Sequence, residues 1–217
     1  MKKALIIMAA ATLFLVGKAN AQVDVNIGFA TQTVTTTSGN WHDTVGTNGL
    51  FIGVSRNFPI ASGLNVSLGI QGRYNFKSEE KTINAGILGS AKATAQYSQM
   101  LVDIPVLLNY GFELGSGIKL YLMAGPTISY ALFGKTKWDA NANVLGALNL
   151  GSDGEDDWYE EDDKYNKFDI AATFGACLDF NNIKVYGGYN LGLLNLSSAD
   201  NTTRKSSNLF IGLGYSL

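Results

Sequence analysis

Cysteine, histidine and proline are scarce in this chain. Its 217 residues include one cysteine, Cys177, one histidine, His42, and three prolines. A single cysteine cannot form a disulfide within the chain, so disulfides do not stabilise the fold. A thiol-based metal site is excluded for the same reason. No glycine-rich loop of the kind that cradles phosphate is present either. The sequence therefore predicts no cofactor, no metal site and no catalytic or cofactor-binding residue.

A long apolar run is also missing. The longest, Ala4 to Val16, falls short of the roughly 20 apolar residues of a membrane-spanning helix. It follows two lysines and precedes Ala19-Asn20-Ala21, which together are typical of a secretory signal peptide over residues 1–21. The mature chain, residues 22–217, then forms one domain. No cysteine follows the cleavage site, so we expect no lipoprotein anchor, and any membrane span has to be made of strands.

Positive charge is in short supply once the signal peptide is removed. The whole chain has 16 basic and 18 acidic residues. Cleavage removes Lys2, Lys3 and Lys18, which leaves 13 basic residues against 18 acidic ones, a net charge of −5. This balance gives no support to nucleic-acid binding.

Alternating apolar residues are what the sequence does have. From Tyr97 to Phe133, every second residue is apolar over two runs, separated by the break Glu113–Gly117. Period-two alternation predicts β-strands, because successive side chains point to opposite faces. Two such runs joined by a glycine-rich turn predict a hairpin. Each run is longer than an average strand and suits a tilted strand of about 9–11 residues that crosses a bilayer.

The same alternation predicts eight strands in total. Short turns are expected at Pro59–Gly63, Glu113–Gly117 and Asn181-Asn182, and long polar loops alternate with them. The predicted strands are Val23–Gln32, Gly49–Phe58, Leu64–Lys77, the two strands within Tyr97–Phe133, Tyr165–Phe180, Ile183–Leu194 and the segment that follows Ser206. The predicted loops are Thr33–Asn48, Ser78–Ala95, Gly134–Lys164 and Asn195–Ser206.

An even number of antiparallel strands, with short turns at one end and long loops at the other, is typical of an outer-membrane barrel. The predicted fold class is therefore all-β, an eight-stranded antiparallel up-and-down transmembrane β-barrel. Short turns belong on the periplasmic side, so both termini are expected there. The longest loop, Gly134–Lys164, is predicted to lie outside the cell and to be mobile.

The two faces of the strands differ in composition. One face is apolar, with aromatic residues near both strand ends, as expected of two girdles at the membrane interfaces. The other is rich in glycine, alanine, serine, threonine and asparagine, which fit a narrow lumen. Some charged residues of this inward face are expected to pair across the lumen and plug it. These residues are Asp24, Arg73, Asp103, Lys119, Asp169, Asp179 and Lys184.

Proline is unexpected in a closed barrel, because it cannot donate a ladder hydrogen bond and no edge strand is available to accommodate it. Pro105 therefore predicts a bulge or a missing hydrogen bond, and Pro126 predicts the same more weakly.

Several segments resemble a known family. They are Leu101–Tyr110, Leu120–Pro126, Phe174–Ala176, Tyr186–Leu193 and Phe210–Leu217. In these segments the chain resembles the small outer-membrane barrels described as porin-family or PorT-like, of the OmpA/OmpX type. The resemblance covers nearly all of the mature chain. It implies a barrel in the outer membrane of a Gram-negative cell and implies little about activity.

Two candidate sites can be weighed from the residues. His42 lies beside Asp43 and near Ser38, and a His–Ser pair at the outer rim could be nucleophilic. No G-x-S-x-G elbow accompanies it, so we favour no enzyme activity. The acidic stretch 153–163 could bind divalent cations through carboxylate oxygens. It lacks the ordered spacing of an EF-hand, so solvated charge is the favoured interpretation.

Three functions remain open. The leading hypothesis is a small structural or surface-interaction barrel that displays extracellular loops. The alternatives are a narrow porin-like channel for small solutes and an outer-membrane enzyme acting on lipid at the outer rim. The expected partners are outer-membrane lipid, lipopolysaccharide and the barrel-assembly machinery, with no nucleic acid and a monomeric state.

Overall fold

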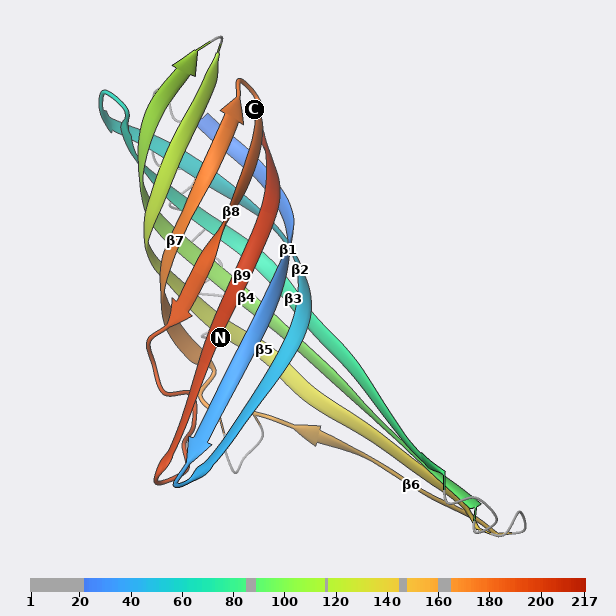
Figure 1. Ribbon diagram of the computed structural model, residues 1–217. Helices are drawn as coiled ribbons and strands as arrows, with labels where there is room; N and C mark the ends of the chain where they lie inside the picture. Colours follow the sequence, from blue (N-terminus) through green and yellow to red (C-terminus); the bar gives the residue numbers. More distant parts are fainter. Residues whose placement is uncertain (1–21, 85–88, 116, 145–147, 160–164) are drawn as a thin grey trace.

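The computed structural model describes residues 22–84, 89–115, 117–144, 148–159 and 165–217. These residues form nine antiparallel strands (Figure 1). The predicted signal peptide, residues 1–21, lies outside the described residues. No helix of the described residues is long and apolar enough to cross a membrane. The strands are β1 Gln22–Ser38, β2 Trp41–Ala61, β3 Leu64–Asn84, β4 Gly89–Gly115, β5 Ile118–Val144, β6 Leu148–Asp157, β7 Phe168–Phe180, β8 Ile183–Gly192 and β9 Thr202–Ser216.

Eight of these strands close a ring. Each of β1 to β5 pairs with the next strand, β5 pairs with β7, and β7, β8 and β9 continue the order until β9 pairs with β1. The ninth strand, β6, pairs with β5 beyond the point where β7 ends. The predicted up-and-down barrel of eight strands is thus confirmed, and one further strand is added outside the ring.

The strands are much longer than predicted at the loop end. β1 and β2 pair continuously from Gln22–Asn57 to Ser38–Trp41, so most of the predicted loop Thr33–Asn48 is a hairpin that turns at Gly39 and Asn40. Loop predictions failed here because an exposed sheet needs no apolar alternation. Threonine is β-branched and favours strands without it.

The outer ends of β3, β4 and β5 together with β6 form a four-stranded sheet beyond the ring, here called the projecting sheet. Figure 1 shows it leaning away from the barrel. The predicted loops Ser78–Ala95 and Gly134–Lys164 are therefore largely strands. Described residues of the second loop pair in register from Lys135–Asp157 to Val144–Leu148. The expectation that 134–164 is a mobile loop is wrong for these paired residues, and residues 160–164 lie outside the described part.

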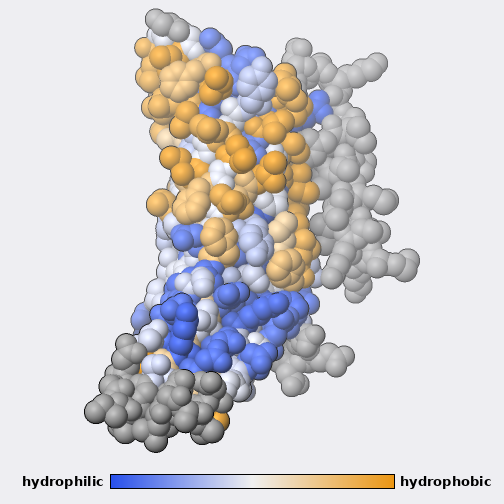
Figure 2. All heavy atoms as spheres, turned by 90° about the vertical axis from the view of Figure 1, so that its right-hand side faces the viewer, coloured by the Kyte–Doolittle hydropathy of each residue, from blue (hydrophilic) through white to orange (hydrophobic). Residues whose placement is uncertain are grey.

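The apolar face points outward, as predicted. Leu122 is 51% exposed and Ile27 is 58% exposed, whereas Leu101 on the opposite face is 6% exposed. On the face that Figure 2 shows, the apolar residues form a band over the barrel wall, which gives way to hydrophilic residues toward the loop end. Among the aromatic residues predicted for the two girdles, Phe29, Tyr110, Phe168 and Tyr215 are exposed on this surface.

Pro105 interrupts a ladder without shifting its register. The β3–β4 pairing includes Leu68–Val106 and resumes at Gln71–Asp103, with two unpaired residues on each strand. The missing hydrogen bond predicted at Pro105 is confirmed, and no bulge accompanies it. Pro126 lies opposite Ala172 in a continuous β5–β7 ladder. On its other side the β4–β5 ladder goes from Pro105–Thr127 to Leu108–Ala124 and leaves Pro126 unpaired, so the prediction for Pro126 is confirmed as well.

If the apolar band faces lipid, a charged side chain at its centre should destabilise the folded barrel strongly. Leu122→Arg should lower the free energy of unfolding in lipid vesicles by about 2–4 kcal/mol, as expected for arginine at the midplane. Leu150→Arg is the matched control, because Leu150 is similarly exposed, at 55%, but lies on the projecting sheet. Equal stability of the two variants in urea titrations would mean that the apolar band does not face lipid.

Candidate functional site

A buried ion pair lies on the lumen wall, between the neighbouring strands β3 and β4. Arg73 on β3 donates from Nε to Asp103 Oδ2 at 2.8 Å and from Nη2 to Asp103 Oδ1 at 3.2 Å. The two residues are 4% and 0% exposed. Gln71 and Ser129 also donate to the Asp103 carboxylate, at 3.2 and 2.6 Å. This bidentate geometry is the arrangement in which a buried pair has its hydrogen bonds satisfied.

Amide side chains extend the network toward the loop end. Gln32 on β1 accepts from Arg73 Nη1 at 3.2 Å and donates to Ser206 Oγ at 2.8 Å. Asn75 donates to Gln32 and to Gln99, and the Gln99 contact is 3.2 Å. These residues come from β1, β3, β4 and β9, so the network spans the lumen from wall to wall.

A second ion pair lies at the turn end. Lys184 on β8 donates to Asp24 Oδ2 at 2.7 Å, and Asn57 donates to the same oxygen at 2.7 Å. Ser216 donates to Asp24 Oδ1 at 2.6 Å. Asp24 therefore joins the first strand to the last, where β1 and β9 close the ring.

The predicted pairing of inward charges is confirmed for four of the seven residues. Lys119 is an exception, because it lies exposed at the rim, 3.8 Å from Glu113 of the neighbouring strand. Asp169 and Asp179 line the inward face without an ion pair to any described residue. The prediction that some of these charges pair is thus confirmed. The pairs join β3 to its neighbour β4 and β8 to β1, not opposite walls of the lumen.

The segment after β6 covers the loop end of the lumen. The Trp158 backbone N–H donates to Gly134 O at 2.8 Å, and its indole donates to Thr136 Oγ1 at 2.8 Å. The Tyr159 hydroxyl accepts from Gln99 at 2.9 Å. Gly134 is required here, because a Cβ at this position would lie 2.5 Å from Trp158 Cε3. Burial raises the pKa of the Tyr159 phenol above its usual value.

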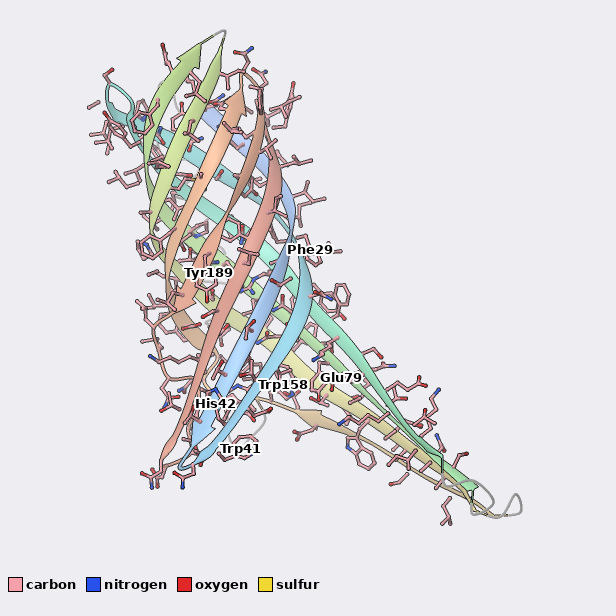
Figure 3. All side chains as sticks on the ribbon, viewed as in Figure 1. Phe29, Trp41, His42, Glu79, Trp158 and Tyr189 are labelled. Carbon is pink, nitrogen blue, oxygen red and sulfur yellow. The ribbon has the colours of Figure 1, made fainter. Side chains whose placement is uncertain are left out.

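Arg204 stacks between aromatic rings beside this cover. Its Cζ lies 3.9 Å from the ring centre of Tyr165 and 5.9 Å from that of Trp158. Lys167 makes a similar contact with Tyr159, at 5.6 Å. A cavity of about 180 Å³ opens here, and Figure 3 shows Trp158 between the β1–β2 hairpin and the projecting sheet. No pattern in the sequence indicates these contacts, since they join segments far apart in the chain.

The candidate rim residues are not brought together as a site. His42 accepts from or donates to Thr37 Oγ1 at 3.0 Å, on the exposed tip of the β1–β2 hairpin. Ser38 lies on the other face of this hairpin and accepts from Thr202 Oγ1 at 3.3 Å. Asp43, next to His42 in the strand, also points to the opposite face. The candidate His42–Ser38 pair is therefore not formed in the described residues.

Only part of the acidic stretch 153–163 lies in the described residues. Residues 153–157 belong to β6, where Glu155 pairs with Lys135 and, at 3.3 Å, with Lys137. Hydrogen bonds from Lys135 and Lys137 lower the pKa of the Glu155 carboxyl. No cluster of three metal-ligating side chains occurs in the described part of the chain. Residues 160–163 lie outside that part, so cation binding there stays untested.

The sequence matches the family described as "Outer membrane protein beta-barrel domain" over residues 16–198. The chain belongs to this family of outer-membrane β-barrel proteins, and its location is the outer membrane. A comparison with curated proteins finds no significant match.

Solved structures of small outer-membrane proteins are similar at low identity. Ail of Yersinia pestis is 14% identical, with a TM-score of 0.36, over 92% of this chain and 100% of Ail. Neisserial surface protein A is 13% identical, with a TM-score of 0.40, over 92% and 100%. The outer-membrane enzyme PagL is 13% identical, with a TM-score of 0.36, over 84% and 97%. These neighbours include an enzyme, so they do not decide whether this chain is one.

Because Arg73 and Asp103 pair with each other, we expect substitutions of the two residues to have non-additive effects on the free energy of unfolding. Arg73→Met leaves Asp103 charged and unpaired, so it should lower the free energy of unfolding in lipid vesicles by about 3–5 kcal/mol. The double variant Arg73→Met/Asp103→Leu should recover most of this loss. Lys137→Met, which breaks an exposed pair, should cost about 0–1 kcal/mol. Additive costs for the double variant would show that the pair does not act as one unit.

Proposed function

We propose that this protein is a surface-interaction barrel, anchored by its lipid face and displaying the projecting sheet outside the cell. Both termini lie in the periplasm and the chain is monomeric in this proposal. The barrel contacts outer-membrane lipid and lipopolysaccharide, and it is inserted by the barrel-assembly machinery. The observation that carries the proposal is the unequal composition of the two faces of the projecting sheet.

One face of the projecting sheet is mostly small and apolar on β4, β5 and β6, and it carries the charged residues Glu79 and Lys81 along β3. Paired residues share a face, so the strand registers assign this face directly. Trp138 packs over Gly154 and remains 43% exposed, and Ile83 and Leu150 are more exposed still. The alanines of this face are Ala91, Ala93, Ala95, Ala140 and Ala142.

The opposite face is charged. Lys92 pairs with Glu80 at 3.0 Å, and Lys135 and Lys137 pair with Glu155. Such exposed pairs keep a sheet face solvated. A soluble sheet that exposes a contiguous apolar face on one side only is typical of a binding surface. The tilt of the sheet away from the barrel leaves this surface accessible to large partners (Figure 1).

The filled lumen favours this role over a channel. In the middle of the lumen, the network centred on Arg73 and Asp103 leaves a cavity of only about 30 Å³. A hydrated ion needs room for its water shell, and opening the path would break the bidentate pair.

Planar-bilayer recordings should therefore show no steady conductance for the folded protein. The variant Arg73→Ala/Asp103→Ala, which removes both charged side chains, should show more frequent openings than the wild type. A stable pore in the wild-type protein would support the channel alternative instead.

The separation of His42 from Ser38 favours an interaction role over an enzyme at the outer rim. A nucleophilic hydroxyl needs its base within about 2.6–3.2 Å, and the two side chains lie on opposite faces of one hairpin.

Site-specific photo-cross-linking in intact cells tests the interaction role. A photoreactive residue at Ala93, on the apolar face, should give discrete protein adducts, because a bound partner lies against it. The neighbouring Thr94, on the charged face, is the matched control and should give few. Trp138→Ser should reduce the adducts at position 93, since it removes the largest apolar side chain of the face.

A membrane-impermeant maleimide checks the topology in the same cells. Ala93→Cys should react in intact cells, whereas Ala61→Cys, at the turn end, should react only after the outer membrane is opened. The native Cys177 is buried. Equal adducts at positions 93 and 94, or labelling of the turn end alone, would remove the proposed role.

A further inference from the structure

A cavity of about 140 Å³ lies in the turn-end half of the lumen. It extends from Gln22 and Asn57 at the turn end to Arg73 of the central ion pair. The proposed function does not use this cavity, because the projecting sheet lies at the other end of the barrel.

Aromatic rings form much of the cavity wall. Phe51 and Tyr186 have ring centres 6.4 Å apart, and Tyr186 and Phe210 are separated by 6.3 Å. These rings pack against glycines of neighbouring strands. A Cβ at Gly28 would be 2.3 Å from Phe51 Cζ, and one at Gly212 would be 2.5 Å from Tyr186 Cζ. The glycines therefore hold the rings at the wall, so the centre stays open.

Two hydrogen-bond acceptors in this wall have no partner among the described residues. Asn109 is 5% exposed, and its Nδ2 donates to Asn65 Oδ1 at 2.8 Å while its own Oδ1 is unpaired. Asn190 is 7% exposed and donates to Asn208 Oδ1 at 3.0 Å, again with Oδ1 unpaired. Leaving a buried acceptor without a hydrogen bond costs free energy, so we expect both oxygens to accept a hydrogen bond from a bound molecule.

We propose that the turn-end cavity binds a small molecule with one aromatic ring and a hydrogen-bond donor, the phenol class of ligand. The size fits, because an engineered apolar cavity of about 150 Å³ in another protein holds benzene. The ring packs against Phe51, Tyr186 and Phe210, and the donor satisfies Asn109 or Asn190. Since the cavity reaches the turn end, the ligand enters from the periplasmic side.

Fluorine NMR of the folded protein in lipid nanodiscs tests the site, with 4-fluorophenol and fluorobenzene as probes. A bound signal distinct from the lipid-partitioned one is expected for both. The phenol should bind about tenfold more tightly, as one net hydrogen bond predicts. Asn109→Leu and Asn190→Leu preserve the side-chain volume but remove an acceptor. At least one of them should bring the ratio of the two affinities close to one.

A space-filling variant supplies the control for the cavity itself. Cys177 lines the cavity, so Cys177→Phe should abolish the bound signal of both probes while the barrel remains heat-modifiable on gels. If this variant does not fold, the two asparagine variants still decide the outcome. Absence of a bound signal in the wild type means that the cavity holds water only. That result, or an unchanged affinity ratio in both asparagine variants, would overturn the proposal.

Discussion

Closure of the hydrogen-bonded ring is the constraint on which the rest of this structure depends. A strand in lipid has no water to satisfy its backbone, so every strand within the band needs two neighbours. The β1–β9 ladder, which runs from Asp24–Ser216 to Ser38–Thr202, supplies the last of these pairings. The side chain of Asp24 reinforces it through Lys184 and Ser216, so the ends of the chain are tied together at the turn end.

A ring of eight strands fixes what the lumen can contain. Its interior has room for little beyond side chains. Charged residues in that space have to meet one another, as Arg73 meets Asp103, and large rings need glycines opposite them, as Phe51 needs Gly28. The same narrowness separates the interior into a turn-end cavity and a mouth cavity, with the Arg73–Asp103 network between them. These features favour a closed barrel over an open channel.

Outside the apolar band, water can hydrogen-bond to free strand edges, so a strand no longer needs two neighbours. The ends of β3, β4, β5 and β6 leave the ring with free edges and form a sheet that water can satisfy on both sides. One face carries paired charges such as Lys92–Glu80, whereas the other exposes Trp138 among alanines and has Glu79 and Lys81 along β3. Contact with water does not require the two faces to differ in composition. The proposed interaction is therefore assigned to the face that exposes Trp138.

The sequence by itself determined the fold class, the strand faces and most of the ring, because burial in lipid imposes a strict alternation on residues such as Ile27 and Leu122. It also indicated the pairing of Asp24, Arg73, Asp103 and Lys184, since charges in a narrow lumen need partners. Only the tertiary structure decided that the predicted loops are mostly strands, because a solvated sheet carries no periodic apolar signal. It also decided that Lys119 is a rim residue, that His42 and Ser38 are apart, and that Tyr159 covers the mouth. These outcomes depend on register, bulges and contacts between distant segments, which no local pattern of residues records.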